Sequence, residues 1–293
     1  MLQSLQRGLD IIRRKASFCP EFWIQSKIKL LNTYMRENKL NGCVINLSGG
    51  IDSSTVFALC LAAQRVDQSP INKIMGVYQP INSSAKFAHH VDLCRCLITD
   101  KNTANIITVD QSDIFEKLST VVYEASGITG GVFATGQLKS YMRTPVADYI
   151  SQLLTQEGCP SIVMGTGNYD EDGYLRYFCK AGDGISDVQI IADLHKSQVK
   201  TIASYMGVPH PIINTKPSAD LWDGQTDEDE LGFSYDFVEL LTTYHKFSSV
   251  EQEEFYNSLD EESRNYFNEK RLIAERVALR NKHKEIYPID LNL

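Results

Sequence analysis

The chain has 293 residues, with 37 acidic against 29 basic side chains and a formal net charge of -8. This balance argues against a dominant nucleic-acid-binding surface, because such surfaces cluster lysines and arginines to neutralise phosphates. No apolar run is long enough to cross a bilayer, and Met1 to Arg14 is amphipathic and polar, unlike a signal peptide. We therefore expect a cytoplasmic protein without membrane or nucleic-acid partners.

The length permits one large α/β domain or two small ones, and no repeat, low-complexity block or linker argues for two. We expect a single domain over 1–293, with a core at about 40–245 and helical extensions at 1–39 and 246–293. The seven cysteines contain no Cys-x-x-Cys pair, which favours buried free thiols over a zinc site.

Apolar runs alternate with amphipathic segments along the chain. In chain order the patterns predict a helix over 22–38, a strand over 43–47, a helix over 51–66, a strand over 73–79, a helix over 83–99, a strand over 104–109, a helix over 114–126, a helix over 136–157, a strand over 161–165 and a strand over 188–194. This alternation predicts an α/β fold, a doubly wound parallel sheet of about five strands with flanking helices. Ligands of such sheets bind beyond the carboxyl ends of the strands, so the segments after these ends are expected to line one crevice.

The most informative segment is the loop Ser48-Gly49-Gly50-Ile51-Asp52-Ser53-Ser54, which joins the first predicted strand to a helix. Its glycines allow positive φ and the close approach of a phosphate to backbone amides. The helix that follows favours an anion at its N-terminus. Asp52 beside bound phosphates would repel them unless a divalent cation lay between, so we interpret it as a magnesium ligand. The alternative is a glycine-rich turn with a serine helix cap.

This loop differs from the phosphate loop of kinases and GTPases, because no lysine lies between Leu47 and Ala58. It resembles instead the Ser-Gly-Gly-x-Asp-Ser loop of ATP pyrophosphatases, which cleave ATP between its α and β phosphates. Ser48, Ser53 and Ser54 supply hydroxyl groups to such a loop. The resemblance implies that the loop binds ATP.

A second polar block follows the predicted strand over 161–165 and contains Asp170, Glu171 and Asp172 in succession. Three adjacent carboxylates repel one another unless water or a cation compensates. We interpret Glu171 as a second carboxylate for the metal, whereas a solvated acidic turn is an equal alternative for its two neighbours. Thr166 lies directly after the strand, where its hydroxyl and backbone can face a nucleotide.

Three further segments carry charged residues. Lys180 to Asp187 is a glycine-rich loop that suits substrate contact better than core packing. Lys196 follows the last predicted strand, where a lysine can reach phosphate oxygens. The acidic run from Asp223 to Glu230 is interpreted as a solvated face or helix cap. By composition alone, His283-Lys284 is a charged helix end.

Together these segments resemble the NAD synthetase family. That family has the Ser-Gly-Gly-x-Asp-Ser loop, a Gly-Thr before a metal-binding glutamate, a Lys-x-Gly-Asp-Gly loop, a Leu-x-Lys, a Pro-Thr/Ser-Ala-Asp-Leu turn and a His-Lys. The corresponding positions here are Ser48 to Ser53, Gly165-Thr166 with Glu171, Lys180 to Gly184, Leu194 to Lys196, Pro217 to Leu221, and His283-Lys284. The motifs occur in the family's order, over roughly Leu40 to Lys284.

The resemblance implies the amidation of nicotinic acid adenine dinucleotide (deamido-NAD) to NAD by ATP and ammonia. It implies catalytic roles for Asp52, Glu171 and Lys196, with Mg²⁺ held by Asp52 and Glu171. It implies ATP contacts from Ser48, Gly49, Gly50, Asp52, Ser53, Ser54, Thr166, Lys196 and Ser218. It implies contacts to deamido-NAD from Arg143, Tyr141, Lys180, Asp187, His283 and Lys284. The family is typically homodimeric, so a homodimer is expected as well.

The chain departs from the family pattern at one arginine, a dinucleotide contact in many relatives, whose place Tyr141 takes while Arg143 remains. Glutamine-dependent relatives carry a nitrilase-like domain, for which the sequence has no room before Ser48, so we expect free ammonia or a separate amidotransferase subunit as the nitrogen donor. Two alternatives stay open. The same loop could activate another acceptor, as in GMP synthesis or tRNA modification, or the chain could be a nucleotide-binding regulatory module without catalysis.

Overall fold

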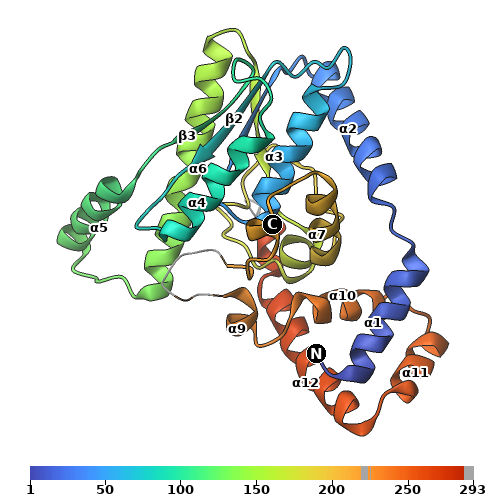
Figure 1. Ribbon diagram of the computed structural model, residues 1–293. Coiled ribbons are helices and arrows are strands. Elements are labelled where there is room, and N and C mark those ends of the chain that lie inside the picture. The colour runs from blue at the N-terminus through green and yellow to red at the C-terminus, as the bar shows by residue number, and fades with distance from the viewer. Residues whose placement is uncertain (219–223, 225, 287–293) are drawn as a thin grey trace, which may run out of the picture.

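A five-stranded parallel sheet forms the centre of the computed structural model, which describes residues 1–218, 224 and 226–286 (Figure 1). The strand order is β3-β2-β1-β4-β5, and all four neighbouring pairs are parallel. The strands are β1 (Gly42–Asn46), β2 (Lys73–Tyr78), β3 (Ala104–Thr108), β4 (Ser161–Gly165) and β5 (Val188–Gln189). The predicted α/β fold with a parallel sheet of five strands is therefore confirmed.

Helices surround this sheet and extend beyond one end of it. The helices before β5 are α1 (Gln3–Ala16), α2 (Pro20–Glu37), α3 (Ile51–Gln64), α4 (Ala85–Cys94), η1 (Arg95–Leu97), α5 (Ser112–Ser126), α6 (Val132–Gln156) and the π-helical turn η2 (Tyr169–Leu175). Those after β5 are α7 (Lys196–Tyr205), α8 (His210–Ile213), α9 (Asp227–Leu231), α10 (Tyr235–Tyr244), α11 (Ser249–Ser258), α12 (Glu261–Arg280) and η3 (Lys282–Lys284).

The alternation of side chains along β1 buries both faces of the sheet. Cys43 and Ile45 belong to an apolar cluster with buried side chains of α2, α3 and α7. Val44 points to the opposite face and clusters with Ala147 and Leu154 of α6. Because side chains of a strand point to alternate faces, a strand covered by helices on both sides must be apolar throughout. The core of the fold therefore lies in two layers, one on each side of the sheet.

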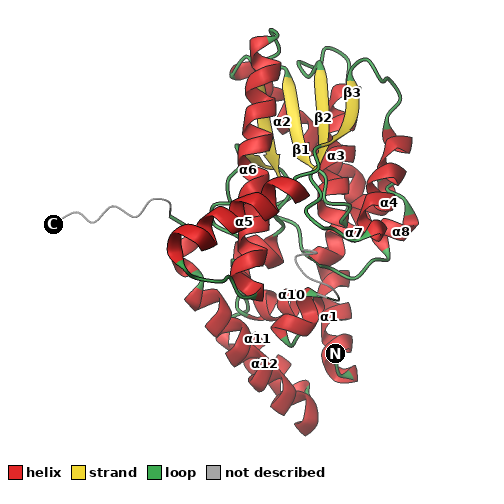
Figure 2. Ribbon diagram, turned by 90° about the vertical axis from the view of Figure 1, so that its left-hand side faces the viewer, coloured by secondary structure: helices red, strands yellow, loops and turns green. Residues whose placement is uncertain are grey.

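A second apolar core joins the two ends of the chain. Leu5 and Leu9 of α1 share a cluster with Phe237 of α10 and Phe267 of α12. These helices and α11 gather beyond one end of the sheet in both views (Figures 1 and 2). The proposed division into a core and two helical extensions stays a prediction, although the first and last long helices do pack together.

Two predicted elements differ in type from the structure over part of their length, and the remaining predictions differ only in their end residues. The strand over 188–194 contains only Val188–Gln189, because β4 ends at Gly165 opposite Gln189 and offers no further partner. The apolar residues that follow are buried in the core beside α7 instead. The predicted helix over 83–99 is α4 followed by a short 3₁₀ turn, so its α-helical part ends at Cys94.

The strand order places the crevice of the sheet between β1 and β4. The chain continues from β1 to β2 and β3 on one side, and then returns to β4 and β5 on the other side. Such a reversal of strand order opens a crevice at the carboxyl ends of the two central strands, where ligands of open α/β sheets bind. The loop after β1 and the turn after β4 therefore meet at this position. Among the described residues, no helix has the length and apolarity needed to cross a membrane.

Candidate active site

The sequence allows a left-handed backbone at both glycines of the loop. Only Gly49 adopts it. Its φ is +80°, and a Cβ atom at this position would lie 2.6 Å from the carbonyl oxygen of Phe87. A side chain is therefore excluded by both backbone conformation and space. Gly50 has φ -83° and an extended conformation, and it is the residue from which α3 begins. The chain thus turns sharply once and enters the helix immediately.

The hydroxyl groups of the loop hold it in this conformation. Ser48 Oγ lies 3.1 Å from Ser53 Oγ and accepts a hydrogen bond from the backbone N–H of Gly50 at 3.2 Å. The backbone N–H of Ser48 donates to Ser53 Oγ at 3.3 Å, and Ser54 Oγ donates to the Gly50 carbonyl at 2.8 Å. These bonds connect the first residue of the loop to the first turn of α3. The loop is therefore pre-shaped.

Two carboxylates and one ammonium group converge beyond β1 and β4. Lys196 Nζ lies 2.6 Å from Asp52 Oδ2 and 2.6 Å from Glu171 Oε1. The three side chains come from α3, η2 and α7, and they are 16%, 16% and 6% exposed for Asp52, Glu171 and Lys196. The structure thus brings together the three residues for which the sequence predicts catalytic roles, although they are 144 residues apart at the extremes.

Asn168 joins the same two carboxylates and was not singled out from the sequence. Its Nδ2 atom donates to Asp52 Oδ1 at 3.0 Å and to Glu171 Oε2 at 2.8 Å. It is the residue before η2, and its side-chain oxygen accepts the backbone N–H groups of Asp170 and Glu171. An asparagine two residues before an acidic pair, shortly after a strand end, is a helix-capping signal, so the sequence contained a cue to its position.

Asp170 binds the backbone at the start of α7, where Lys196 lies. Its two oxygens accept hydrogen bonds from the backbone N–H of Lys196 at 2.7 Å and from His195 Nδ1 at 2.7 Å, with the imidazole in the tautomer that carries this proton. The residue is fully buried, so the solvated acidic turn considered for it is wrong. Burial raises the pKa of this carboxyl group, while its bonds to His195 and Lys196 oppose that effect.

Asp227 and Tyr235 line the far side of the lysine. Tyr235 Oη donates to Asp227 Oδ2 at 3.1 Å, and Lys196 Nζ lies 5.3 Å from the centre of the tyrosine ring. Asp227 is 6% exposed, so the interpretation of the acidic run as a solvated face is wrong at this residue. Nothing in the spacing of the run marks this residue, because its burial depends on distant partners such as Tyr235 and Pro217.

Electrostatics keep the lysine charged. Burial alone would lower the pKa of Lys196, but Asp52 and Glu171 raise it above its ordinary value. Burial raises the pKa of Glu171 to about 7, because desolvation and repulsion from Asp52 outweigh the attraction of the ammonium group. A site with two carboxylates and one cation retains a deficit of positive charge. It therefore favours an additional cation when anionic groups bind.

The donor set fits a divalent ion. Mg²⁺ is commonly held by one or two carboxylates together with phosphate oxygens of a substrate, and Asp52 and Glu171 supply two hard oxygen donors beside the pre-shaped loop. Within the described part of the chain, no group of three or more histidine, cysteine, aspartate or glutamate residues has the arrangement of a metal cage. Further ligands would therefore come from a phosphate-bearing substrate or from water.

Three residues predicted for nucleotide binding line one small cavity. Ser48, Arg143 and Ser218 border a space of about 50 Å³ at the carboxyl ends of β1 and β2. Gln79 organises its wall, because its Nε2 donates to Asn46 Oδ1 at 2.7 Å and to the carbonyl of Arg143 at 3.1 Å. Thr166 lies immediately beyond the end of β4. The rest of the predicted turn, residues 219–221, lies outside the described residues.

The lysines predicted to contact deamido-NAD point to main-chain oxygens. Lys180 Nζ donates to the carbonyl of His283 at 2.8 Å. Lys284 Nζ donates to the carbonyls of Arg176 and Phe178 at 3.1 and 2.6 Å. The C-terminal turn is therefore tied to the segment that leads into the glycine-rich loop. The structure brings these predicted residues together, but as a brace between two parts of the chain.

The other residues predicted to contact deamido-NAD have different neighbours. Asp187 Oδ2 accepts the backbone N–H of Val163 at 2.8 Å, which makes it a support for β4. Arg143 Nε donates to the Gln79 carbonyl at 3.4 Å. Tyr141 of α6 is 43% exposed, and burial together with its neighbour Cys179 raises the pKa of its phenol.

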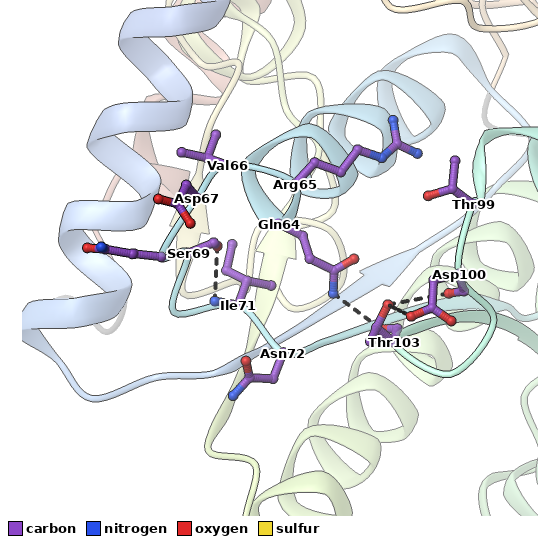
Figure 3. A pocket seen from close by; sticks show the side chains of 11 residues that line it. Gln64, Arg65, Val66, Asp67, Ser69, Ile71, Asn72, Thr99, Asp100 and Thr103 are labelled. Carbon is purple, nitrogen blue, oxygen red and sulfur yellow. Dashed lines mark hydrogen bonds between the residues drawn. The ribbon is translucent and has the colours of Figure 1, made fainter.

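A larger hollow lies at the opposite end of the sheet (Figure 3). Its volume is about 570 Å³, and polar side chains near the amino ends of β2 and β3 line it. Several of them bond within their own loops, as Thr103 Oγ1 does to Asp100 Oδ2 at 3.2 Å. Ligands of parallel sheets bind at the carboxyl ends, so this hollow is separate from the candidate active site.

Comparison with known proteins identifies relatives across nearly the whole chain. Residues 23–288 match the family model described as NAD synthase. The NH(3)-dependent NAD(+) synthetase of Methanocaldococcus jannaschii is 31% identical over 262 residues, which cover 89% of this chain and 92% of that protein. The one from Methanococcoides burtonii is 32% identical over 223 residues, covering 74% of this chain and 78% of that protein.

Solved structures share the fold. NMN synthetase from Francisella tularensis superposes with a TM-score of 0.74 at 24% identity, covering 94% of this chain and 100% of that one. NH3-dependent NAD synthetase from Campylobacter jejuni gives a TM-score of 0.69 at 19% identity, with coverage of 94% and 100%. The arrangement of sheet and flanking helices is therefore that of these synthetases.

Proposed function

The chain belongs to the NAD synthase family, and we propose that it catalyses the ATP-dependent amidation of deamido-NAD to NAD with ammonia. Similarity over most of the chain to proteins named NH(3)-dependent NAD(+) synthetase supports this proposal. The single structural observation that carries it is the convergence of Asp52, Glu171 and Lys196 beside the Ser48 loop.

The reaction has two steps. A carboxylate oxygen of the nicotinate group attacks the α-phosphorus of ATP, and the bond to pyrophosphate breaks. Ammonia then attacks the activated carbonyl carbon, loses a proton and expels AMP, which leaves the amide. AMP itself activates the acyl group, so no residue of the chain needs to act as a covalent nucleophile.

The site residues would serve the first step by neutralising charge. The protonated Lys196 would bind phosphate oxygens and stabilise the pyrophosphate as it departs. Backbone amides and hydroxyls of Ser48 to Ser54 would bind phosphates at the start of α3. Mg²⁺ held by Asp52 and Glu171 would supply further positive charge to the leaving group.

We assign the remaining predicted residues in the same way. Thr166 and Ser218 would contact ATP, since Ser218 shares a cavity with the loop residue Ser48. Arg143 and Tyr141 of α6 would contact deamido-NAD. For Lys180, Asp187, His283 and Lys284 the observed bonds favour an indirect role, in which they shape the acceptor pocket.

A cytoplasmic homodimer is the assembly that we propose. Helices α5 and α6 expose an unusual number of large apolar side chains, and α5 stands away from the sheet (Figure 1). These residues are 38% to 66% exposed: Ile114, Leu118, Val121, Val122, Val132, Phe133, Tyr149 and Leu153. We assign these exposed apolar side chains to the interface between the two subunits, because exposed apolar surface of this kind favours association. Light scattering of the purified protein should give twice the 33.0 kDa chain mass, and a monomer would contradict the assignment.

Product analysis tests the function directly. With ATP, Mg²⁺, ammonium and deamido-NAD, the products should be NAD, AMP and pyrophosphate, whereas glutamine should not replace ammonium in the absence of an amidotransferase subunit. Formation of ADP and phosphate would contradict the pyrophosphatase loop. The assay should also include nicotinic acid mononucleotide, because one structural neighbour is an NMN synthetase. Turnover with another acceptor alone would assign a different substrate, and no turnover with any would favour a regulatory module.

A further inference from the structure

A closed ring of four side chains forms the centre of the candidate site. Each carboxylate of the pair uses one oxygen for Lys196 and the other for Asn168. The ammonium contacts are 2.6 Å to both Asp52 Oδ2 and Glu171 Oε1, and the amide contacts are 3.0 Å to Asp52 Oδ1 and 2.8 Å to Glu171 Oε2. Two bridging donors therefore fix the spacing of the carboxylates from opposite sides.

The orientation of the Asn168 amide is determined by its surroundings. Its oxygen accepts the backbone N–H groups of Asp170 and Glu171, both at 3.0 Å, and its nitrogen faces two carboxylates. Turning the amide over would place donors against donors and acceptors against acceptors. The side chain is fully buried, and all of its hydrogen-bonding capacity is used.

The turn that carries Asn168 is itself anchored to α7. The backbone N–H of Tyr169 donates to the Leu194 carbonyl at 2.9 Å, and Asp170 accepts the backbone N–H of Lys196 at 2.7 Å. A Cβ atom on Gly167 would lie 1.9 Å from Asp172 Oδ2, so the turn fits closely against the acidic segment. The two residues that follow Asn168 are thus fixed by hydrogen bonds to the segment that begins α7, which limits the movement of Asn168 itself.

Lys196 and Asn168, which both link Asp52 to Glu171, should respond differently when a phosphate-bearing substrate binds. The ammonium of Lys196 ends a flexible chain and is attracted by phosphate oxygens. The neutral amide of Asn168 has no such attraction and does not repel an incoming divalent cation. When the lysine turns to the phosphates, only the amide still links Asp52 to Glu171.

We propose that Asn168 is a positioning residue that holds Asp52 and Glu171 at the spacing required by a divalent cation. The proposal rests on the proposed function, since it concerns the metal that would accompany ATP. Asn168 touches neither substrate nor metal in this role. It acts through the two carboxylates, as groups behind metal ligands generally do.

Two substitutions separate this role from simple capping of η2. Asn168→Ser retains an oxygen that can accept the backbone N–H groups, but it lacks the amide nitrogen that bridges the carboxylates. Asn168→Ala removes both functions. Ser248→Ala is the control for loss of a cap elsewhere, because Ser248 Oγ accepts the backbone N–H of Glu251 at the start of α11.

Manganese binding provides a readout that does not depend on turnover. Mn²⁺ affinity is measured by electron paramagnetic resonance on the full chain with α,β-methylene ATP, which cannot release pyrophosphate. Asn168→Ser should weaken Mn²⁺ binding by about 10- to 100-fold, the usual effect of losing a group behind a metal ligand, and its melting temperature should stay near that of the wild type. Asn168→Ala should show the same loss of affinity and melt lower, whereas Ser248→Ala should melt lower and bind normally.

Unchanged Mn²⁺ affinity in Asn168→Ser would overturn the proposal, as would a loss that simply follows the melting temperature across the variants. A wild-type protein that binds no Mn²⁺ with the analogue would overturn both the metal assignment and this inference. Normal Mn²⁺ binding without NAD formation would instead reject only the acceptor, because no acceptor is present in the binding experiment.

Discussion

Two charged regions of the molecule use their lysines in opposite ways. Beyond β1 and β4, Lys196 lies between two carboxylates and is buried with them. In the C-terminal brace, Lys180 and Lys284 donate to backbone carbonyls of distant segments. In the first arrangement the charged side chains can exchange their mutual ion pairs for contacts with bound phosphates and cations. The second satisfies main-chain oxygens and holds two parts of the chain together. All three lysines were predicted from the sequence to contact a substrate. In the structure only Lys196 lies among groups that could take part in the chemistry directly.

The largest effect that would test this contrast is expected at Asp52. Asp52→Ala should lower kcat by about two orders of magnitude or more, as expected when a charged transition-state contact is lost. Steady-state production of NAD and pyrophosphate measures the effect. Asp67→Ala serves as the control, because Asp67 is exposed at the opposite end of the sheet and should leave kcat unchanged. A nearly normal kcat for Asp52→Ala would contradict the assignment of Asp52 as a metal ligand.

The next largest effect is expected at Glu239, and it concerns the stability of the fold. Buried Glu239 accepts Arg13 Nη2 at 2.6 Å and Ser197 Oγ at 2.7 Å, which links α1 and α10 to the start of α7. Glu239→Ala should lower the free energy of unfolding by about 2 kcal/mol, because the buried carboxylate no longer accepts the bonds from Arg13 and Ser197, and hydrogen bonds to charged groups contribute in this range. Urea denaturation measures the loss.

The matched control is the neighbouring Asp236, which pairs with the same arginine but is 44% exposed. Asp236→Ala should cost below about 1 kcal/mol, the usual range for exposed ion pairs. Equal losses for the two variants would show that burial does not distinguish these contacts.

Lys284 tests whether the C-terminal turn is a brace. Lys284→Met keeps the aliphatic stem but leaves the carbonyls of Arg176 and Phe178 without this donor. It should lower the free energy of unfolding by about 1 kcal/mol, a typical value for lost hydrogen bonds, and should raise the KM for deamido-NAD. Lys282→Met, at an exposed position of the same turn, should change neither quantity. A raised KM with unchanged stability would indicate direct contact with the substrate instead.

The smallest effect is expected at Tyr141. Tyr141→Ala should raise the KM for deamido-NAD by a few-fold, about 1 kcal/mol of lost binding, and it should leave the KM for ATP nearly unchanged. Initial-rate measurements with each substrate varied in turn compare the two constants. Gln152→Ala, at an exposed position of the same helix outside the apolar surface, is the control. Equal changes in both KM values would show that Tyr141 has no selective role in the acceptor pocket.

Much of the fold follows from local patterns. Apolar strands alternating with amphipathic helices predicted the parallel sheet, and the start of α3 follows directly from the glycine loop. The strand over 188–194 was too long because its length depends on where β4 ends, which periodicity does not record. Burial of Asp227 was missed for a similar reason, since it requires α9 to pack beside Tyr235.

By itself the sequence determined the chemistry available at the site: a phosphate-sized turn with Asp52, a glutamate after β4 and a lysine after β5. These signals are local, because they depend on which residue types follow a strand end. Only the tertiary structure decided which groups meet. The strand order puts β1 beside β4, so Asn168 reaches both carboxylates, while Lys180 and Lys284 reach carbonyls. Such pairings depend on distances between segments far apart in the chain, and residue order alone does not specify those distances.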